Sequence, residues 1–458
     1  MLGTLDRRRC VQTIFSLGAT LGSQFHWQSE LAAQIQATGK RRHLVILWMP
    51  GGPSQLDTWD LKPGHANGGP FRELQTTVPG MRFSEHLPAL AQWAHHLAIV
   101  RSMRTKEGDH SRGTYLVRTG QAPGQPVRFP AVPAAIGKEL APSTTAGTPG
   151  YVSILPSTFL NPSAFGAGFL GAGCEPLTVQ QMGEGAMGQK TTEDQDVTAD
   201  SNRMAELQVE NLRPPSDLPE QRTERRRRMW NMLQQSYAAP WRGSPAVVHD
   251  TVYRRAMQLA DSSVVDAFDL NQESEEVRRS YGTSAFGQGC LMARRLIEYG
   301  VPVVEVALEL RQNALNWDTH QDNFPTVKRL SGILDRAWGR LMQDLHDRGL
   351  LQHTTVLWMG EFGRTPEINR MGGRDHFPNA WSCVLAGAGI QGGAILGRTS
   401  TDGREIIDRP VSVPELLATV CRAVGIDPHR ENVNEDGRPL KIVDGLPIAE
   451  LLDVTANG

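Results

Sequence analysis

Short apolar runs alternate along this chain with longer segments in which apolar residues recur every three or four positions. The runs have the length of strands buried on both faces of a sheet, and the longer segments have the period of helices that cover one. The pattern predicts strands at residues 43–49, 97–100, 150–155, 301–306 and 354–359, and helices at 85–96, 273–300 and 329–349. This alternation predicts an α/β fold with a mainly parallel central sheet and helices on both faces.

The length, net charge and cysteine content of the chain limit the classes of function that it can have. The chain has 458 residues, enough for two or three domains, but the layout of its motifs predicts a single domain over residues 38–458. A net charge of −2 gives no case for binding nucleic acid or an anionic membrane. The five cysteines show no CxxC spacing, so neither a disulfide framework nor a zinc knuckle is expected. No apolar run is long enough to span a bilayer in the mature chain.

Residues 1–37 have a different character. Asp6-Arg7-Arg8-Arg9-Cys10 precedes a short, weakly apolar stretch at residues 14–22. This order is typical of a twin-arginine export signal, and the alternative is a basic, frayed N-terminal helix. The sequence therefore predicts export to the periplasm or another extracytoplasmic space by the twin-arginine machinery.

Acidic and imidazole side chains follow several of the predicted strands. Ligands of open α/β sheets bind outside the carboxyl ends of the strands, so these residues form a candidate divalent metal site. The candidate ligands are Asp57, Asp318, His320, Glu361, Asp375 and His376. Carboxylate and imidazole together suit Zn²⁺, Mn²⁺ or Fe best, with Ca²⁺ as a further candidate. Two alternatives stay open: Glu361 pairs with Arg364, and Asp375 orients the imidazole of His376 instead of binding the metal.

A second group follows the strand at residues 97–100. Asp109-His110-Ser111-Arg112 offers a nucleophile or a ligand, and a guanidinium able to hold two oxygens of a phosphate or sulfate. The alternative is a helix start with Ser111 as its cap. The candidate catalytic residues are His110, Ser111, Arg112 and Arg364.

Two other patterns are less specific. Residues 166–171 match GxGxxG, but no strand precedes them and no helix follows, so a loop is favoured over a nucleotide site. Five arginines lie between Arg222 and Arg228 in a helical window. A solvated helix face is the favoured interpretation, and a basic substrate patch is the alternative.

Several sequence blocks resemble an uncharacterised family of exported bacterial proteins, domain of unknown function 1501. The resemblance covers nearly the whole chain, with the blocks in the same order. They are Gly51-Gly-Pro-Ser-Gln-Leu-Asp-Thr-Trp-Asp60, residues 168–171, 267–270, 281–282 and 293–296, Trp317-Asp-Thr-His320, Gly360-Glu-Phe-Gly-Arg-Thr-Pro366 and Gly373-Arg-Asp-His376.

More distantly, the chain is similar to the alkaline phosphatase and sulfatase superfamily. His110 to Gly120 has the length of the sulfatase segment that runs from the nucleophile to Thr-Gly, and Glu361-Phe362-Gly363 resembles the end of its central strand. The resemblance implies an alkaline-phosphatase-like fold and one or two metals. The residues it assigns to these metals are Asp57, Asp318, His320, Glu361 and His376.

This chain departs from the superfamily pattern at two positions. His110 stands where a nucleophile is expected, and Phe362 stands where a second ligand is expected. The sulfatase Cys-x-Pro-x-Arg motif is absent, so a formylglycine nucleophile is not expected.

The function predicted from the sequence is an exported metal-dependent hydrolase of phosphate or sulfate esters. Its substrate would be a small anionic ester or a sulfated or phosphorylated polymer. The metal would act as a Lewis acid, with Ser111 or a metal-bound hydroxide as nucleophile and Arg112 or Arg364 on the developing charge. The alternative is a non-catalytic metal-binding or envelope-associated relative, and a nucleotide-binding oxidoreductase ranks third.

Overall fold

The computed structural model describes residues 42–141, 147–182, 204–210, 212, 220–237, 245–308 and 315–453. The predicted signal segment at residues 1–37 and most of the polar stretch at 182–202 lie outside these residues. Residues Arg42–Gly458 group as one compact unit. Within the described part of the chain, no helix is both long enough and apolar enough to cross a membrane.

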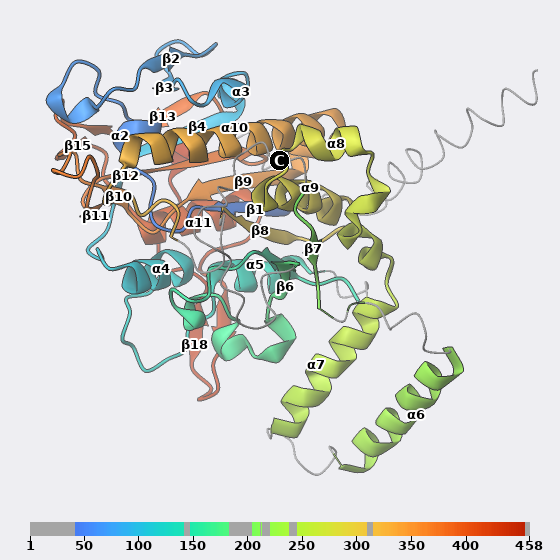
Figure 1. The fold of residues 1–458 in the computed structure, drawn as a ribbon. Helices are drawn as coiled ribbons and strands as arrows, with labels where there is room; N and C mark the ends of the chain where they lie inside the picture. The colour runs from blue at the N-terminus through green and yellow to red at the C-terminus, as the bar shows by residue number, and fades with distance from the viewer. Residues whose placement is uncertain are drawn as a thin grey trace, which may run out of the picture. The chain divides into compact units, whose positions relative to one another are not determined.

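A central sheet organises the fold (Figure 1). The described residues build a ten-stranded sheet in the order β13-β4-β12-β9-β1-β8-β5-β6-β7, with β16 beside β4. Its strands are β1 (His43–Trp48), β4 (Leu97–Arg104), β5 (Tyr151–Ile154), β6 (Leu177–Gln181), β7 (Leu207–Gln208), β8 (Val303–Ala307), β9 (Thr354–Met359), β12 (Trp381–Gly387), β13 (Ala394–Leu396) and β16 (Val411–Ser412). Strand β1 runs parallel to both β8 and β9, whereas β12 and β7 run antiparallel to their neighbours. The prediction of a mainly parallel sheet is confirmed.

Four two-stranded ribbons lie outside the sheet. They pair β2 (Glu73–Gln75) with β3 (Arg82–Ser84), β10 (Gly363–Arg364) with β11 (His376–Phe377), β14 (Arg398–Thr399) with β15 (Ile406–Asp408), and β17 (Glu431–Val433) with β18 (Pro439–Lys441). The β10–β11 ribbon matters most for function, because it carries Arg364 and His376 opposite each other.

Helices cover both faces of the sheet, as the sequence predicts. They are α2 (Gln55–Thr58), α3 (Pro88–Ala91), α4 (His110–Thr119), α5 (Val132–Leu140), α6 (Glu220–Tyr237), α7 (Pro245–Ala260), α8 (Glu275–Ser280), α9 (Ala285–Glu298), α10 (Asn323–Asp347) and α11 (Val413–Ala423). In Figure 1, α9 and α10 lie above the sheet, and α4, α5 and α11 lie below it. The strands are buried on both faces, which explains why they appear in the sequence as continuous apolar runs.

Two predicted helices are shorter than expected. The segment at 273–300 is split into α8 and α9, because Ser284 caps a new helix through its contact with the Gly287 N–H at 3.1 Å. The segment at 85–96 contains only α3 and a short 3₁₀ turn. Asp335 accepts the N–H groups of Ala89 and Leu90 at 2.9 Å each, so α3 begins where a side chain of α10 caps it.

A buried charge network ties α4 to the sheet. Arg118, from the last turn of α4, lies 2.7 Å from Glu305 of β8, and both side chains are almost fully buried. Tyr151 and Ser153 of β5 donate hydrogen bonds to the same carboxylate, each at 3.1 Å. The guanidinium also stacks over the ring of Phe165 at 3.8 Å. These contacts fix the helix that carries His110 against the neighbouring strands β8 and β5.

Candidate metal centre

The carboxyl ends of three strands bring the candidate residues together. His110 opens α4, which follows β4; Asp318 and His320 follow β8; and Glu361 comes directly after β9. Strand β11 adds His376. Since β4, β8 and β9 run in the same direction, the residues that follow them meet at one edge of the sheet.

Asp318 is the centre of this group. Its Oδ1 lies 3.2 Å from Nε2 of His376 and 3.1 Å from Nε2 of His320. Its Oδ2 lies 3.3 Å from Nε2 of His110. One carboxylate therefore faces the same nitrogen atom of three imidazoles that come from three parts of the chain.

The other nitrogen of each imidazole is held by an oxygen acceptor. Nδ1 of His110 lies 2.6 Å from Oε1 of Glu361, and Nδ1 of His320 lies 2.7 Å from Oδ1 of Asp375. Nδ1 of His376 lies 2.7 Å from the carbonyl of Gly108. Such oxygens only accept, so each Nδ1 carries the hydrogen, and a neutral ring then presents a lone pair at Nε2. Ligand histidines are usually held in this way.

The spacing of the three acceptor atoms fits a cation. Nε2 of His320 and Nε2 of His376 are 3.0 Å apart, and both lie beside Oδ1 of Asp318. A divalent cation with ligands at about 2.1 Å places neighbouring ligand atoms about 3 to 3.4 Å apart. His110, Asp318 and His376 also offer ligand atoms that all lie within 4.8 Å of one another. The residues at this edge of the sheet therefore fit a divalent metal.

Two buried atoms of the cluster lack a hydrogen bond. They are Oε2 of Glu361, which has no such partner among the described residues, and Nε2 of His110, whose 3.3 Å contact with Oδ2 of Asp318 is favourable only when the ring is protonated. A buried polar atom without a partner is costly, and native proteins satisfy nearly all of them. A bound cation would supply the missing interaction at His110.

A glycine-containing loop and a buried arginine contact the carboxylates of the cluster. Arg364 is fully buried, and its Nη2 lies 2.6 Å from Oδ1 of Asp318. The same guanidinium donates to the carbonyls of Gly51 and Gly52, in the loop after β1. Gly51 has a φ of +106°, and a Cβ there would lie 2.5 Å from the backbone nitrogen of Asp318. Only glycine fits at this position, and its N–H donates to Glu361 at 2.9 Å.

The charges of the cluster shift its ionisation. Burial lowers the pKa of His110, but its contacts with Asp318 and Glu361 outweigh burial and raise that pKa to about 9. Burial raises the pKa of Asp318, but His110, His376 and Arg364 together hold it well below its usual range. Without a metal, a proton on His110 therefore provides the positive charge that the carboxylates attract.

The structure does not bring Asp57 to this cluster. Its carboxylate takes two contacts from Arg374, at 2.7 and 3.1 Å, and one from the amide of Asn323 at 2.8 Å. Asp57 and Arg374 are both fully buried. The expected convergence of Asp57 with the other candidates is absent because a buried arginine has already engaged this carboxylate.

Two of the candidate catalytic residues point elsewhere. Arg112 is held by Glu107 through contacts of 2.6 and 2.9 Å at the surface. Ser111 lies 3.3 Å from the amide nitrogen of Asn161. Asp109 caps α4 through the backbone N–H of Arg112, so the alternative in which Ser111 caps the helix is wrong.

Three contacts in the cluster were not expected from the sequence. Asp375 holds the ring of His320, not that of His376, which is held by the backbone of Gly108. Phe362, predicted to occupy a ligand position, packs its ring 5.0 Å from the ring of His110 and 4.7 Å from that of His376. It forms an apolar wall of the cluster.

The fold resembles solved structures only weakly. The PsFucS1 sulfatase from Pseudoalteromonas sp. is 9% identical with a TM-score of 0.38, and the match covers 88% of this chain and 72% of that one. The zinc complex of the C-terminal periplasmic domain of EcEptC from Escherichia coli is 10% identical with a TM-score of 0.35, covering 91% and 93%. A phosphonate monoester hydrolase from Silicibacter pomeroyi is 13% identical with a TM-score of 0.34, covering 89% and 75%. Likeness at this level says nothing about the reaction.

The sequence places the chain in a family more firmly. No curated protein matches it significantly. The family model described as "Protein of unknown function (DUF1501)" matches residues 41–452, which is most of the chain. The match includes every residue of the cluster built around Asp318, as well as Asp57 and its partner Arg374. This chain therefore belongs to the DUF1501 family of proteins of unknown function.

Proposed function

We propose that this protein is a metal-dependent hydrolase of phosphate or sulfate esters, with its site at the cluster around Asp318. One observation carries the proposal: three imidazoles, each held at Nδ1 by an oxygen, present Nε2 to the same carboxylate. The residues that would hold the metal are His110, Asp318, His320 and His376. A bound divalent cation would polarise the ester oxygen and lower the pKa of a water nucleophile.

The chain's own residues have the following roles in this proposal. Glu361 and Asp375 hold the rings of His110 and His320 in the tautomer that leaves Nε2 free. Arg364 keeps Asp318 ionised and oriented from below, and since it is fully buried it does not touch the substrate. His320 is 45% exposed at its side chain, which makes the His320 side of the cluster the approach for an ester.

A second candidate is a protein that binds the metal without catalysis. It is favoured by the state of the two arginines that were expected to hold an anionic ester. Arg112 is engaged by Glu107, and Arg364 is buried beneath Asp318. Neither guanidinium is placed to bind a phosphate or sulfate group.

Metal content and turnover together distinguish these functions. We would purify the protein without chelators, measure bound metals by mass spectrometry, and assay p-nitrophenyl phosphate and p-nitrophenyl sulfate. The His376→Gln protein should lose both metal and hydrolysis, whereas Arg112→Gln, as the matched surface control, should keep both. Bound metal without hydrolysis of either ester would favour the second candidate. A wild-type protein that binds no divalent metal would contradict both.

We also propose that the protein is exported through the twin-arginine route. The support is the sequence of residues 1–37, with arginines before a weakly apolar stretch. Replacing Arg7 and Arg8 together with lysine should keep the protein in the cytoplasm. Full yield of the doubly substituted chain outside the cytoplasm would contradict this proposal.

A further inference from the structure

The three imidazoles that face Asp318 are held by partners of different exposure. Glu361, which holds His110, is fully buried, and His376 is held by a backbone carbonyl. In contrast, His320 is 45% exposed, and the carboxylate that holds its Nδ1, Asp375, is 56% exposed. An exposed contact between two side chains is weak, because holding both in one geometry costs rotamer freedom. The His320 side of the centre therefore depends on further contacts to keep the ring in place.

The side-chain amide of Asn369 makes such contacts. Its Nδ2 donates to the backbone carbonyl of His320 at 2.9 Å and, at a longer distance of 3.4 Å, to Oδ1 of Asp375. The same Oδ1 accepts the hydrogen of Nδ1 of His320, at 2.7 Å. One amide thus contacts both the backbone of His320 and the carboxylate that holds its ring.

The loop that carries Asn369 fixes the orientation of this amide. Its Oδ1 accepts the backbone N–H groups of Met371 and Gly373, each at 2.9 Å. Because backbone N–H groups only donate, the atom that faces them is the oxygen, and the atom that faces the carbonyl of His320 is the nitrogen. Gly372 closes the turn with a φ of +67°, which favours glycine. The donor is therefore aimed at His320 by the turn itself.

The same loop lies directly against the segment that carries His320. Gly372 forms an isolated antiparallel β-bridge with Gln321. A Cβ on Gly373 would overlap the carbonyl of His320, so only glycine fits at this close approach. Backbone contacts thus bring the loop to His320, and the amide of Asn369 adds a side-chain link to its ring through Asp375.

The chain has a second turn of the same kind, in the ribbon of β17 and β18, which Figure 1 shows apart from β10 and β11. Oδ1 of Asn434 also accepts two backbone N–H groups, at 3.1 and 2.8 Å, and Gly437 has a φ of +79°. The two turns differ at Nδ2, since that of Asn434 donates only within its own loop, to Asp436 at 3.3 Å. The turn alone therefore needs no outside contact, and the contact of Asn369 with His320 is an additional feature.

We propose that Asn369 is a positioning residue of the metal centre, whose amide keeps Nε2 of His320 facing Asp318. This inference rests on the proposed function, since it concerns how the chain prepares this site for a cation. Asn369 does not itself bind the metal, and it acts through His320. Loss of the amide should loosen the His320 side of the centre and leave the other two imidazoles as they are.

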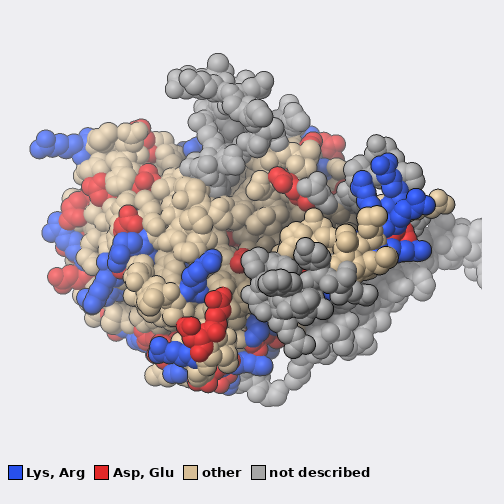
Figure 2. Space-filling view, turned by 90° about the horizontal axis from the view of Figure 1, so that it is seen from below, with Lys and Arg blue, Asp and Glu red and all other residues tan. Residues whose placement is uncertain are grey.

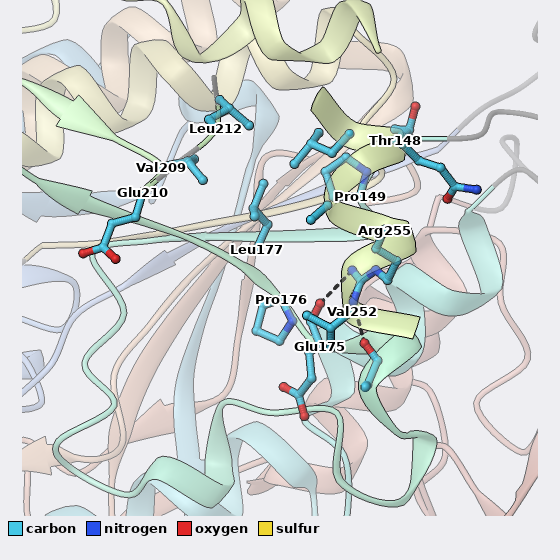
Figure 3. A pocket seen from close by; sticks show the side chains of 15 residues that line it. Thr148, Pro149, Glu175, Pro176, Leu177, Val209, Glu210, Leu212, Val252 and Arg255 are labelled. Carbon is cyan, nitrogen blue, oxygen red and sulfur yellow. Dashed lines mark hydrogen bonds between the residues drawn. The ribbon is translucent and has the colours of Figure 1, made fainter. Parts of the chain in front are cut away.

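A change in metal affinity can be assigned to this centre. Among the described residues, no second group of three ligand-capable side chains comes as close together. The cavity of about 280 Å³ between α7 and β6 has no histidine in its lining, and its Arg255 is held by the carbonyls of Ala172 and Glu175, at 2.6 and 3.0 Å (Figure 3). On the left of Figure 2, Lys and Arg are interspersed with Asp and Glu, so that part of the surface has no large field of one sign.

Replacing Asn369 with serine tests the proposal on the full chain. Asn369→Ser keeps an oxygen for the turn and removes both donors to the His320 side. Isothermal titration of the metal-free protein with Zn²⁺ should give an affinity about 10-fold lower than that of the wild type, the low end for residues that hold a ligand. In a His320→Ala background, the same substitution should have no further effect. An equal loss in both backgrounds would overturn the proposal.

The matched control is Asn434→Ser, which changes the same kind of turn away from the centre. Both substitutions should lower the midpoint of urea denaturation by similar amounts, because each weakens one turn. Only Asn369→Ser should lower the affinity for Zn²⁺. A similar loss of affinity in Asn434→Ser would show that the effect comes from general loosening of the fold, and would overturn the proposal.

A measurement without metal separates this proposal from the proposed function. At about pH 8, above the usual pKa of histidine, nitrogen NMR of labelled histidines should show the hydrogen of His320 on Nδ1. His320→Ala identifies the signals by their absence. Asn369→Ser should shift them toward the form with the hydrogen on Nε2, as should Asn369→Asp if the serine variant does not fold, whereas Asn434→Ser should not.

These signals decide the role of Asn369 whether or not the protein binds a metal. A wild type that binds no divalent cation would contradict the proposed function, and a shift of the His320 signals in Asn369→Ser would still support the positioning role. Unchanged signals of His320 in the folded variant, with unchanged affinity for Zn²⁺, would overturn it.

Discussion

Two aspartates of this protein, the buried Asp57 and the partly buried Asp318, look alike in the sequence and differ in the structure. Asp57 follows β1 and Asp318 follows β8, and each is paired with a buried arginine. Around Asp57, all the neighbouring groups are donors, namely the guanidinium of Arg374 and the amide of Asn323. Around Asp318, the neighbours include three imidazoles whose facing nitrogens would be acceptors when the rings are neutral.

This difference separates a structural residue from a functional one. The carboxylate of Asp57 accepts three hydrogen bonds, and its charge is matched by the buried guanidinium of Arg374, so it does not need a metal to stabilise it. The carboxylate of Asp318 brings acceptor atoms together, and that arrangement is favourable only with an added proton or cation. The donors and acceptors around each carboxylate therefore distinguish a structural residue from a metal ligand better than its position after a strand does.

Breaking the pair at Asp57 should have the largest effect on stability. Arg374→Met leaves a buried carboxylate without its cation, which should lower the free energy of unfolding by about 3–5 kcal/mol. Denaturation in urea measures this loss. The double variant with Asp57→Asn should recover part of it. If Arg374→Met keeps its stability but loses metal, Asp57 belongs to the metal centre after all.

Removing one of the imidazoles that face Asp318 should lower the affinity for the metal rather than the stability of the fold. His376→Ala should lower the affinity for Zn²⁺ or Mn²⁺ by roughly 10–100-fold or more, since even residues that only hold a ligand have effects of this size. Isothermal titration of metal-free protein measures the affinity. Asp375→Asn, which only loosens the ring of His320, should have a smaller effect. An unchanged affinity in folded His376→Ala would remove that residue from the centre.

The pH dependence of the metal-free protein should reveal the proton that replaces the cation. The pKa of His110 is raised to about 9 in the folded chain, above the value near 6.5 of an unfolded histidine. Its stabilisation is therefore complete below about pH 6.5 and is lost as the pH rises through about 9. We expect a decline of about 1–2 kcal/mol across this range, allowing for solvent screening. A His110→Gln protein with the same pH profile would contradict the assignment.

The smallest effect is expected at the surface. Arg112→Gln removes an exposed ion pair with Glu107 and should leave the midpoint of urea denaturation nearly unchanged, because solvent screens such a pair. Metal affinity and ester hydrolysis should stay unchanged, since the guanidinium is engaged by Glu107 at the surface. A marked loss of hydrolysis, with stability preserved, would return Arg112 to the list of anion-binding residues.

The sequence predicts much of the fold because its strands are buried on both faces. Five apolar runs match β1, β4, β5, β8 and β9, and the order of strands and helices implies that residues following parallel strands meet at one edge. His110, Asp318, His320, Glu361 and His376 do meet there. Their metal role remains a prediction.

The parts that could not be predicted depend on partners distant in the sequence. Asp57 is engaged by Arg374, 317 residues away, and no local pattern marks that pair. Asp375 holds the ring of His320, 55 residues away, although His376 is its neighbour in the chain. The α8–α9 break does have a local signal in the sequence, since Ser284 lies three residues before Gly287, as a helix cap requires.

The network of Arg118 and Glu305 bears on the order in which the protein folds. Either side chain buried alone would carry an uncompensated charge, at a cost of several kcal/mol. If α4 packed on the sheet before β8 formed, or β8 formed before α4 packed, one of these charges would be buried without its partner. We expect the two segments to exchange their amide hydrogens as one cooperative unit, although nearly 190 residues separate Arg118 from Glu305. The histidine that opens α4 would then reach Asp318 in the same folding step that buries these charges.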